Sequence, residues 1–214
     1  MLEPIRVIEK VVSKLAPGRP PLSMEVHVVK ALKIIDAKGP IGRVKLSKTL
    51  GLGGGAIRTL VRHLKNAGLI EVSRLGIVLT NSGKKLLSNL KSKIGEDVEI
   101  PKSSLTVGPF NVAILVKNSA EVVKHGLEQR DAAIKVGALG ATTLVFSHGR
   151  LSMPGVEEDI FKDIPAIREA LISKLKPQEN DVIIIGSAND KSIAELGVIA
   201  ATLEILRSYR PISF

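Results

Sequence analysis

The sequence has no cysteine and no tryptophan, and it has no long apolar run. Without Cys in its 214 residues, disulfides and thiolate metal sites are excluded. No apolar run approaches the roughly 20 residues that a membrane span requires. The first residues include the acidic Glu3 and lack the apolar stretch of a signal peptide. We therefore expect a soluble, cytoplasmic protein with no membrane partner.

Motifs for catalysis and metal binding are missing as well. The chain has no His-Glu-x-x-His, no P-loop and no Gly-x-Ser-x-Gly, and its histidines are scattered at positions 27, 63, 125 and 148. The run 51–56 loosely matches a dinucleotide-binding fingerprint, but a helix is expected before it, where that motif needs a strand. We therefore expect no catalytic residue, no metal and no cofactor, and we do not expect an enzyme.

What is abundant is positive charge, and it is confined to one half of the chain. Residues 1–104 contain 19 Lys and Arg against 8 Asp and Glu, a net of +11, whereas residues 105–214 contain 12 against 13, a net of −1. The two halves together give the overall +10. A solubilising or thermophilic preference for Lys would affect both halves alike. The asymmetry instead predicts that the first half meets a polyanion such as nucleic acid.

The few aromatic residues show the opposite distribution. All of them lie in the second half, at Phe110, Phe146, Phe161, Tyr209 and Phe214. Modules that bind single-stranded nucleic acid stack bases on aromatic side chains, so this distribution disfavours an RNA-binding role. Binding to duplex DNA through a helix and backbone contacts needs no aromatic ring.

Periodicity and turn residues predict helices and a hairpin in the first half. Helices are expected within 1–16, from Ser23 to Lys38, over 43–50 with Val44, Leu46 and Leu50 inward, over 56–67, and from Lys84 to Leu90. Glycines at 51–55 form the turn between the third and fourth of these helices. Two short strands, 69–73 and 76–80, flank Arg74 and Leu75 and form a β-hairpin.

This order resembles the winged helix-turn-helix of bacterial and archaeal transcriptional regulators. The similarity rests on the helix 43–50, on the pattern Ile57-x-x-Leu60-Val61-x-x-Leu64-x-x-Ala67-Gly68-Leu69-Ile70, and on Leu79-Thr80-Asn81-Ser82-Gly83-Lys84-x-Leu86 after the hairpin. The resemblance covers about residues 23–95. The chain is also similar to an archaeal family of predicted regulators whose C-terminal domain has no assigned function.

The helix 56–67 is the predicted recognition helix. At about 100° per residue, Arg58, Arg62 and Lys65 share an outward stripe, with Thr59, His63 and Asn66 beside it. Arginine reads guanine with two hydrogen bonds, while the neighbouring polar groups contact bases or phosphates. Arg43, Lys45, Ser47 and Lys48 on the preceding helix suit phosphate contacts, and Arg74 at the wing tip suits the minor groove or the backbone. The alternative for all of them is an ordinary solvated surface.

The second half predicts a small α/β domain with a central sheet flanked by helices. Strands are expected at 111–117, 141–146 and 181–186, and helices at 119–137, 163–175 and 192–208. Residues 96–109 contain Pro101, Pro109 and several charged groups and are predicted as a linker. The fold class is thus α+β and α/β in two domains, with a winged helix at 1–95 (core 23–95) and the α/β domain at 110–214.

Polar residues after two of these strands suggest a ligand site, because ligands in α/β sheets bind beyond the carboxyl ends of strands. A small anionic effector is the expected ligand. The alternative is that these are ordinary loop residues and that Arg130 and Asp131, in the helix 119–137, form a helix-stabilising pair. The candidate residues are Arg130, Asp131, Ser147, His148, Arg150, Ser187 and Asn189.

We therefore expect a two-domain regulator that binds double-stranded DNA and whose second domain senses a ligand, dimerises, or does both. A homodimer is expected because two half-sites multiply specificity. The apolar helix 193–206 supplies either the dimer interface or simply the core. The rival hypothesis is a metabolite-binding protein or enzyme whose winged helix docks proteins, although docking has little need for a net charge of +11.

Overall fold

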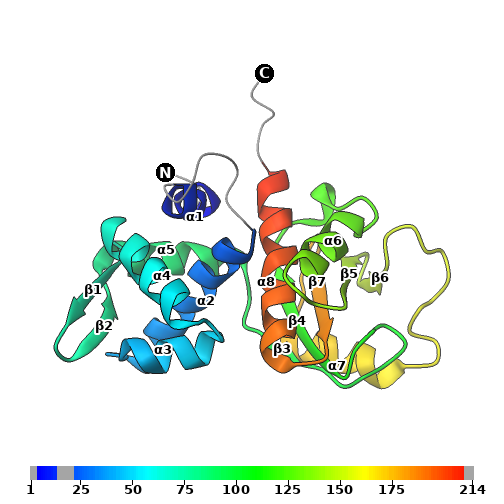
Figure 1. Cartoon of the computed structure of the whole chain (residues 1–214). Coiled ribbons are helices and arrows are strands. Elements are labelled where there is room, and N and C mark those ends of the chain that lie inside the picture. The colour runs from blue at the N-terminus through cyan, green and yellow to red at the C-terminus, as the bar shows by residue number, and fades with distance from the viewer. Residues whose placement is uncertain (1–3, 14–21, 210–214) are drawn as a thin grey trace. The chain divides into compact units, whose positions relative to one another are not determined.

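The computed structural model describes residues 4–13 and 22–209, and it divides into two compact units, Met1–Leu90 and Lys91–Phe214 (Figure 1). We describe each unit by itself. The predicted break at 16–21 lies outside the described residues.

The first unit is a winged helix-turn-helix with an additional helix at its start. Three helices pack around a core that includes Leu32, Leu46 and Leu60, each at most 1% exposed. Ile41 forms an antiparallel bridge with Ile77 and so adds a short third segment to the hairpin. In chain order the elements are α1 (Pro4–Ser13), α2 (Leu22–Lys38), α3 (Arg43–Leu50), α4 (Gly54–Asn66), β1 (Ile70–Ser73), β2 (Gly76–Leu79) and α5 (Asn81–Lys93). This arrangement confirms the predicted fold of the first half.

A glycine in the left-handed conformation makes the turn between α3 and α4. Gly51 has φ +67° and ends α3, a conformation that a residue with a Cβ adopts only at a steric cost. Ser47 closes the turn, since its hydroxyl donates to the Leu52 carbonyl at 2.5 Å. The start of α4 is therefore held in place by α3.

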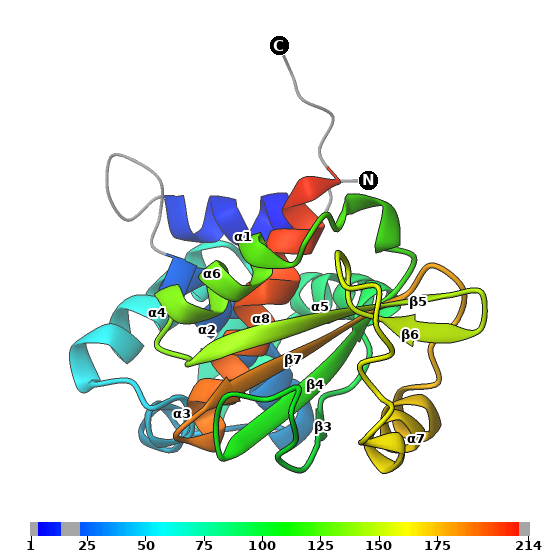
Figure 2. The same ribbon diagram turned by 90° about the vertical axis from the view of Figure 1, so that its right-hand side faces the viewer.

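The second unit is a sheet with strand order β3-β4-β7-β5-β6, in which all paired neighbours are antiparallel. Helices α6 and α8 cover one face of the sheet and α7 covers the other (Figure 2). In chain order the elements are β3 (Val98–Glu99), β4 (Phe110–Val116), the 3-10 turn η1 (Ala120–Val122), α6 (Leu127–Lys135), β5 (Gly140–Ser147), β6 (Arg150–Ser152), α7 (Pro165–Leu175), β7 (Val182–Ala188) and α8 (Lys191–Ser208). The predicted sheet flanked by helices is confirmed.

The central strand β7 is buried on both faces, which explains its unbroken apolar sequence. On one face Ile183 and Ile185 join a cluster with Phe161 and Leu171. On the other face α8 lies so close that a Cβ added to Gly186 would be 2.7 Å from the Ala194 carbonyl oxygen. Nearly every residue of α8 from 194 to 206 is buried in the folded chain. Of the two roles left open by the sequence, this helix therefore forms the core.

Three predictions about the second half were wrong in detail. The expected linker 96–109 instead contributes β3 to the sheet, where Val98 and Glu99 pair with β4, and it buries the apolar side chains of Ile100 and Leu105. The expected helix 119–137 is divided, since Gly126 adopts φ +76° before α6 begins. The expected loop after β5 is a β-hairpin, in which His148 and Gly149 both have positive φ, as a two-residue type I′ turn requires.

Candidate nucleic-acid interface

Helix α4 presents the predicted basic stripe to solvent. Arg58, Arg62 and Lys65 are all exposed, while Ile57, Leu60 and Leu64 on the other side are buried. The Nε–H of Arg58 donates to the Gly54 carbonyl at 3.2 Å, which holds this side chain along the first turn of the helix. Thr59 is half-buried beside the stripe and Asn66 is exposed at the end of the helix. The helix can therefore present two guanidinium groups to the edges of bases.

His63 does not belong to this surface, so its predicted DNA contact is not supported. It is 9% exposed, and its Nε2 has no hydrogen-bond partner among the described residues. At about 100° per residue, position 63 lies only about 60° from Leu60 but at least 100° from every member of the basic stripe. The helical wheel thus contained the signal that His63 borders the core.

Helix α3 carries exposed cations at Arg43, Lys45 and Lys48. Ser47 is half-buried, and its hydroxyl is engaged with the Leu52 carbonyl, so it stabilises the turn between the helices. Val44, which was expected to face inward, is 69% exposed. Residues two apart on a helix point to different sides, so Val44 could not share the face of Leu46.

The wing ends in the two-residue turn of Arg74 and Leu75, both exposed. The Ser73 hydroxyl stabilises this turn by accepting from the Leu75 N–H at 3.2 Å and donating to the Gly76 carbonyl at 3.3 Å. Leu75 is 85% exposed and lies at the tip beside Arg74, although no role for it was predicted from the sequence. The position of Leu75 next to Arg74 in the sequence, within the two-residue turn, already indicated that its side chain would be exposed at the wing tip.

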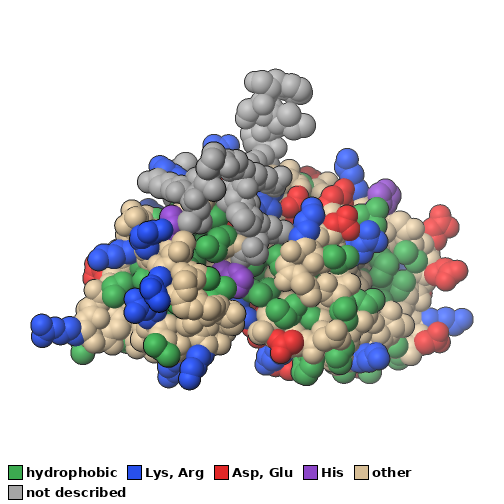
Figure 3. Space-filling view, in the orientation of Figure 1, with side chains coloured by type: hydrophobic (Ala, Val, Ile, Leu, Met, Phe, Trp, Pro, Cys, Tyr) green, Lys and Arg blue, Asp and Glu red, His purple; other side chains and the backbone are tan. Residues whose placement is uncertain are grey.

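Lys and Arg side chains predominate on the visible face of the first unit, whereas both signs of charge are mixed on the second (Figure 3). The charge asymmetry of the sequence is thus a property of the folded surface. A surface of this kind attracts polyanions over a distance of about one Debye length, roughly 8–10 Å in ordinary salt.

The candidate ligand residues of the second unit do not form one site. Strand β7 runs antiparallel to β4 and β5, so its end at Ala188 pairs with Phe110 at the beginning of β4. Ser187 and Asn189 therefore lie at one edge of the sheet, near the start of β5. Ser147, His148 and Arg150 lie at the opposite edge, in the β5–β6 hairpin.

The remaining candidates lie on α6. The Arg130 side chain passes Gly140 at the start of β5, which places it at the edge that holds Ser187. Arg130 and Asp131 form an exposed ion pair at 3.0 Å. Ser187 and His148 each have a hydrogen-bond partner within the chain. The Ser187 hydroxyl donates to the Asn111 side chain at 2.7 Å, and the His148 N–H donates to the Glu179 carboxylate at 3.0 Å.

Within residues 4–13 and 22–209, no three His, Cys, Asp or Glu side chains converge in a way that could hold a metal ion. None of the described helices has both the length and the apolar character that crossing a bilayer requires.

The buried His63 predicts that acid weakens the first unit. Burial lowers the pKa of His63 from its ordinary value of 6.5, and the adjacent Arg62 guanidinium lowers this pKa further. The unfolded chain then binds a proton more readily than the folded one, so the free energy of unfolding falls as the pH drops from 6.5 through the lowered pKa. We expect amide protection factors in α4 to be smaller at about pH 5 than at about pH 7.5.

His63→Gln should reduce this difference, and exposed His125→Gln in the second unit serves as the matched control. Hydrogen exchange is a suitable measurement because it reports on α4 itself, and the first unit contains no aromatic residue whose fluorescence could report its unfolding. An undiminished pH effect in His63→Gln would contradict the assignment.

Comparison with known proteins agrees with the division of the chain into a first and a second unit. Residues 27–94 match the family model of the CggR N-terminal DNA binding domain, and residues 107–205 match the Domain of unknown function (DUF4443). The chain is 35% identical over 195 residues to the central glycolytic genes regulator of Priestia megaterium, covering 90% of this chain and 47% of that protein. The chain thus spans about half the length of that relative.

A solved structure of a hypothetical protein from Pyrococcus horikoshii OT3 is also similar, with a TM-score of 0.63 and 29% identity, and the match covers 85% of this chain and 98% of that one. The match to a DNA-binding domain over residues 27–94 agrees with the exposed basic helix α4 and the wing seen in the first unit. The first unit is thus similar to the CggR N-terminal DNA binding domain, and the second unit is similar to DUF4443.

Proposed function

We propose that this protein is a transcription regulator that reads duplex DNA with α4 in the major groove. The observation that carries the proposal is the exposed stripe of Arg58, Arg62 and Lys65 on the second helix of a helix-turn-helix. The match of residues 27–94 to a DNA-binding domain and the similarity to a gene regulator support it. The role requires no catalysis, and because the relatives come from Priestia megaterium and Pyrococcus horikoshii OT3, we place this protein in the cytoplasm of a prokaryotic cell.

Each basic element has a separate task in this proposal. Arg58 and Arg62 read bases, with Thr59, Lys65 and Asn66 at the margins of the contact. The exposed cations of α3 bind phosphates and set the register without reading sequence. Arg74 at the wing tip contacts the minor groove or the backbone.

The glycines at the start of α4 suit a close approach to DNA. Gly53 and Gly55 have ordinary negative φ, and an added Cβ would meet nothing within 4 Å, so packing within the described chain does not require glycine at either position. The first turn of α4 has no side-chain cap. Its exposed backbone N–H groups and the positive end of the helix dipole can therefore approach a phosphate oxygen directly.

For the second unit we propose effector sensing, dimerisation, or both. A two-fold dimer would place two recognition helices on half-sites about one helical turn of DNA apart. The division of the candidate ligand residues between two edges of the sheet favours separate roles for Ser187 and Arg150 over one shared site.

The salt dependence of DNA affinity tests the proposal. In B-DNA each phosphate contact contributes about 0.9 to the slope of log affinity against log salt concentration. Replacing Arg43, Lys45 and Lys48 with Ala should therefore lower this slope by about 2.7 and weaken binding to all sequences alike. Fluorescence anisotropy with labelled duplexes, selected by footprinting on genomic DNA, measures both quantities.

The matched control removes the same charge from the second unit, through Lys124→Ala, Lys135→Ala and Lys162→Ala, at three exposed positions. Its slope should remain that of the unaltered protein. Equal reductions in the two triple variants would show that charge alone attracts DNA, and the α3 assignment would be abandoned.

A further inference from the structure

Helix α6 of the second unit presents apolar side chains to solvent. Leu127 and Ile134, seven residues apart on this helix, are 49% and 47% exposed. The other side of the helix, with Ala132 and Ala133, is buried against β5 and α8, and Figure 2 shows α6 in front of α8. A single exposed Leu or Ile is ordinary, so the meaning of these two depends on what lies beside them.

Two further apolar side chains continue this surface beyond the helix. Val107 and Leu139 are 64% and 44% exposed. Both are held at Ser187, whose hydroxyl accepts from the Val107 N–H at 3.4 Å and whose carbonyl accepts from the Leu139 N–H at 2.8 Å. Arg130 connects them to α6, because a Cβ added to Gly140 would lie 3.3 Å from Val107 Cγ2 and 3.9 Å from Arg130 Cγ. We call these four apolar residues the α6 surface: Val107, Leu127, Ile134 and Leu139.

Opposite charges flank the apolar ridge of α6. At about 100° per residue, Ile134 lies within about 20° of Leu127 around the helix axis, whereas Arg130 lies about 60° to one side of Leu127 and Asp131 about 40° to the other. The side chains of Arg130 and Asp131 are 51% and 53% exposed and pair with each other at 3.0 Å. Water screens an exposed pair of this kind, so it contributes little to stability. Its two members are therefore free to pair with charges on another molecule.

A second copy of this chain has the complementary surface. When two α6 helices lie parallel about a two-fold axis, Arg130 of each copy faces Asp131 of the other. An antiparallel pair would instead set Arg130 against Arg130 and Asp131 against Asp131. The charges therefore select the parallel arrangement, in which Leu127 meets Leu127 and Ile134 meets Ile134.

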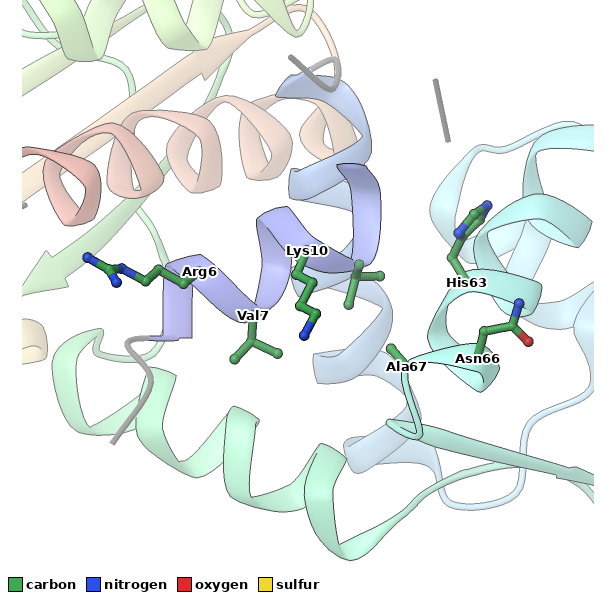
Figure 4. A pocket seen from close by; sticks show the side chains of 7 residues that line it. Arg6, Val7, Lys10, His63, Asn66 and Ala67 are labelled. Atoms are coloured by element: carbon green, nitrogen blue, oxygen red, sulfur yellow. The ribbon is translucent and has the colours of Figure 1, made fainter. Parts of the chain in front are cut away.

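Net charge also favours association through the second unit. The second half of the chain has a net charge of −1, against +11 for the first half, so two first units repel each other. The hollow of the first unit is no exception. This pocket of about 430 Å³ is lined by Arg6 and Lys10 of α1 and by His63 and Asn66 of α4, and no carboxylate is among the described residues of its lining (Figure 4).

We propose that two copies of this chain associate through the α6 surface, as a two-fold dimer with parallel α6 helices. This inference rests on the proposed function, since it names the surface for the dimerisation proposed there. It also assigns tasks to three of the residues first considered for a ligand. Ser187 fixes Val107 and Leu139 beside each other, and Arg130 and Asp131 pair across the two-fold axis.

Sedimentation velocity of the full chain without DNA, over a wide range of protein concentration, tests the dimer. Ile134→Asp sets a charge in the apolar contact of both copies and should weaken self-association a hundredfold or more. Ile172→Asp is the matched control, because Ile172 is also exposed and lies on α7, on the other face of the sheet. It should associate as the unaltered chain does, and circular dichroism confirms that both variants are folded.

Three results would overturn the proposal. The first is an unaltered chain that stays monomeric at every concentration. The second is a dimer that Ile134→Asp leaves intact. The third is a dimer that Ile172→Asp weakens as much as Ile134→Asp does.

Mixing two charge variants tests the pairing between molecules. Arg130→Asp and Asp131→Arg each set like charges against each other across the two-fold axis, so each alone should self-associate at least tenfold more weakly. An equimolar mixture should form a one-to-one dimer with the affinity of the unaltered chain, because both Asp side chains of one copy then face Arg side chains of the other. A role of these residues within one chain cannot produce this rescue. A mixture that stays monomeric would overturn the pairing of Arg130 with Asp131.

Anisotropy with duplex DNA separates the dimer from the proposed function. A chain that dimerises through the α6 surface and binds no duplex DNA would refute DNA reading and leave the dimer. A monomeric chain that binds duplex DNA through α4 would overturn the dimer and leave DNA reading.

Discussion

Replacing Arg58 and Arg62 together with Ala should weaken binding to the specific DNA site by thirtyfold or more. Each bidentate contact between Arg and guanine contributes about 1–3 kcal/mol of discrimination, so losing two costs about 2–6 kcal/mol, and each 1.4 kcal/mol is a factor of ten. Both side chains are exposed, so the fold should remain intact by circular dichroism. Anisotropy titrations at one fixed salt concentration measure the loss.

Lys84→Ala with Lys85→Ala is the matched control, because both residues are exposed on α5 in the same unit. This variant loses the same charge and should keep nearly full sequence preference. Arg58→Lys separates charge from geometry, since Lys cannot make the planar two-bond contact. It should retain binding to random DNA and relax specificity. Unchanged specific affinity in the double Ala variant would refute α4 as the recognition helix.

Gly83→Ala should unfold the winged helix, although Ala normally stabilises a helix relative to Gly by about 1 kcal/mol. An added Cβ at Gly83 would lie 2.1 Å from the Leu69 carbonyl oxygen, and this oxygen already accepts from the Thr80 N–H at 3.1 Å. The Thr80 hydroxyl also accepts from the Gly83 N–H at 3.0 Å. A clash between two backbone segments cannot be relieved by a rotamer change, so we expect a loss of about 4 kcal/mol or more.

The matched control is Gly55→Ala in the first turn of α4, where an added Cβ meets nothing within 4 Å. It should raise the free energy of unfolding by up to about 1 kcal/mol. Thermal melts followed by circular dichroism measure both variants. Fluorescence of the single tyrosine, Tyr209, reports the second unit, which should be unaffected. A Gly83→Ala protein as stable as the Gly55→Ala protein would contradict the close packing at Leu69.

Helical periodicity predicted α4 and most of its buried face, because a surface helix shows its buried face in its sequence. The same rule, applied more strictly, would have separated Val44 from Leu46 and His63 from Arg62. The pocket was beyond reach, since it requires that Lys10 on α1 come to face Asn66 from a distant part of the chain. No local pattern encodes that meeting.

The sheet shows the same division. The strands at 111–117, 141–146 and 181–186 could be read from their apolar runs, and β4 and β7 are buried along nearly their whole length. Their direction could not be read, since an antiparallel and a parallel strand present the same apolar sequence. That direction separates Ser187 from Arg150. The short strand β3 was missed because two residues are too few to show alternation.

The sequence by itself determined the class of this protein: the positive charge of its first half, the winged helix-turn-helix and the basic stripe of Arg58, Arg62 and Lys65. Charge, periodicity and turn glycines are local properties, so they can be recognised in the amino-acid sequence. The tertiary structure alone decided that His63 is buried beside a pocket, that 96–109 belongs to the sheet and that the ligand candidates lie apart. These outcomes depend on which segments, distant in the sequence, pack against one another, and only the tertiary structure shows that.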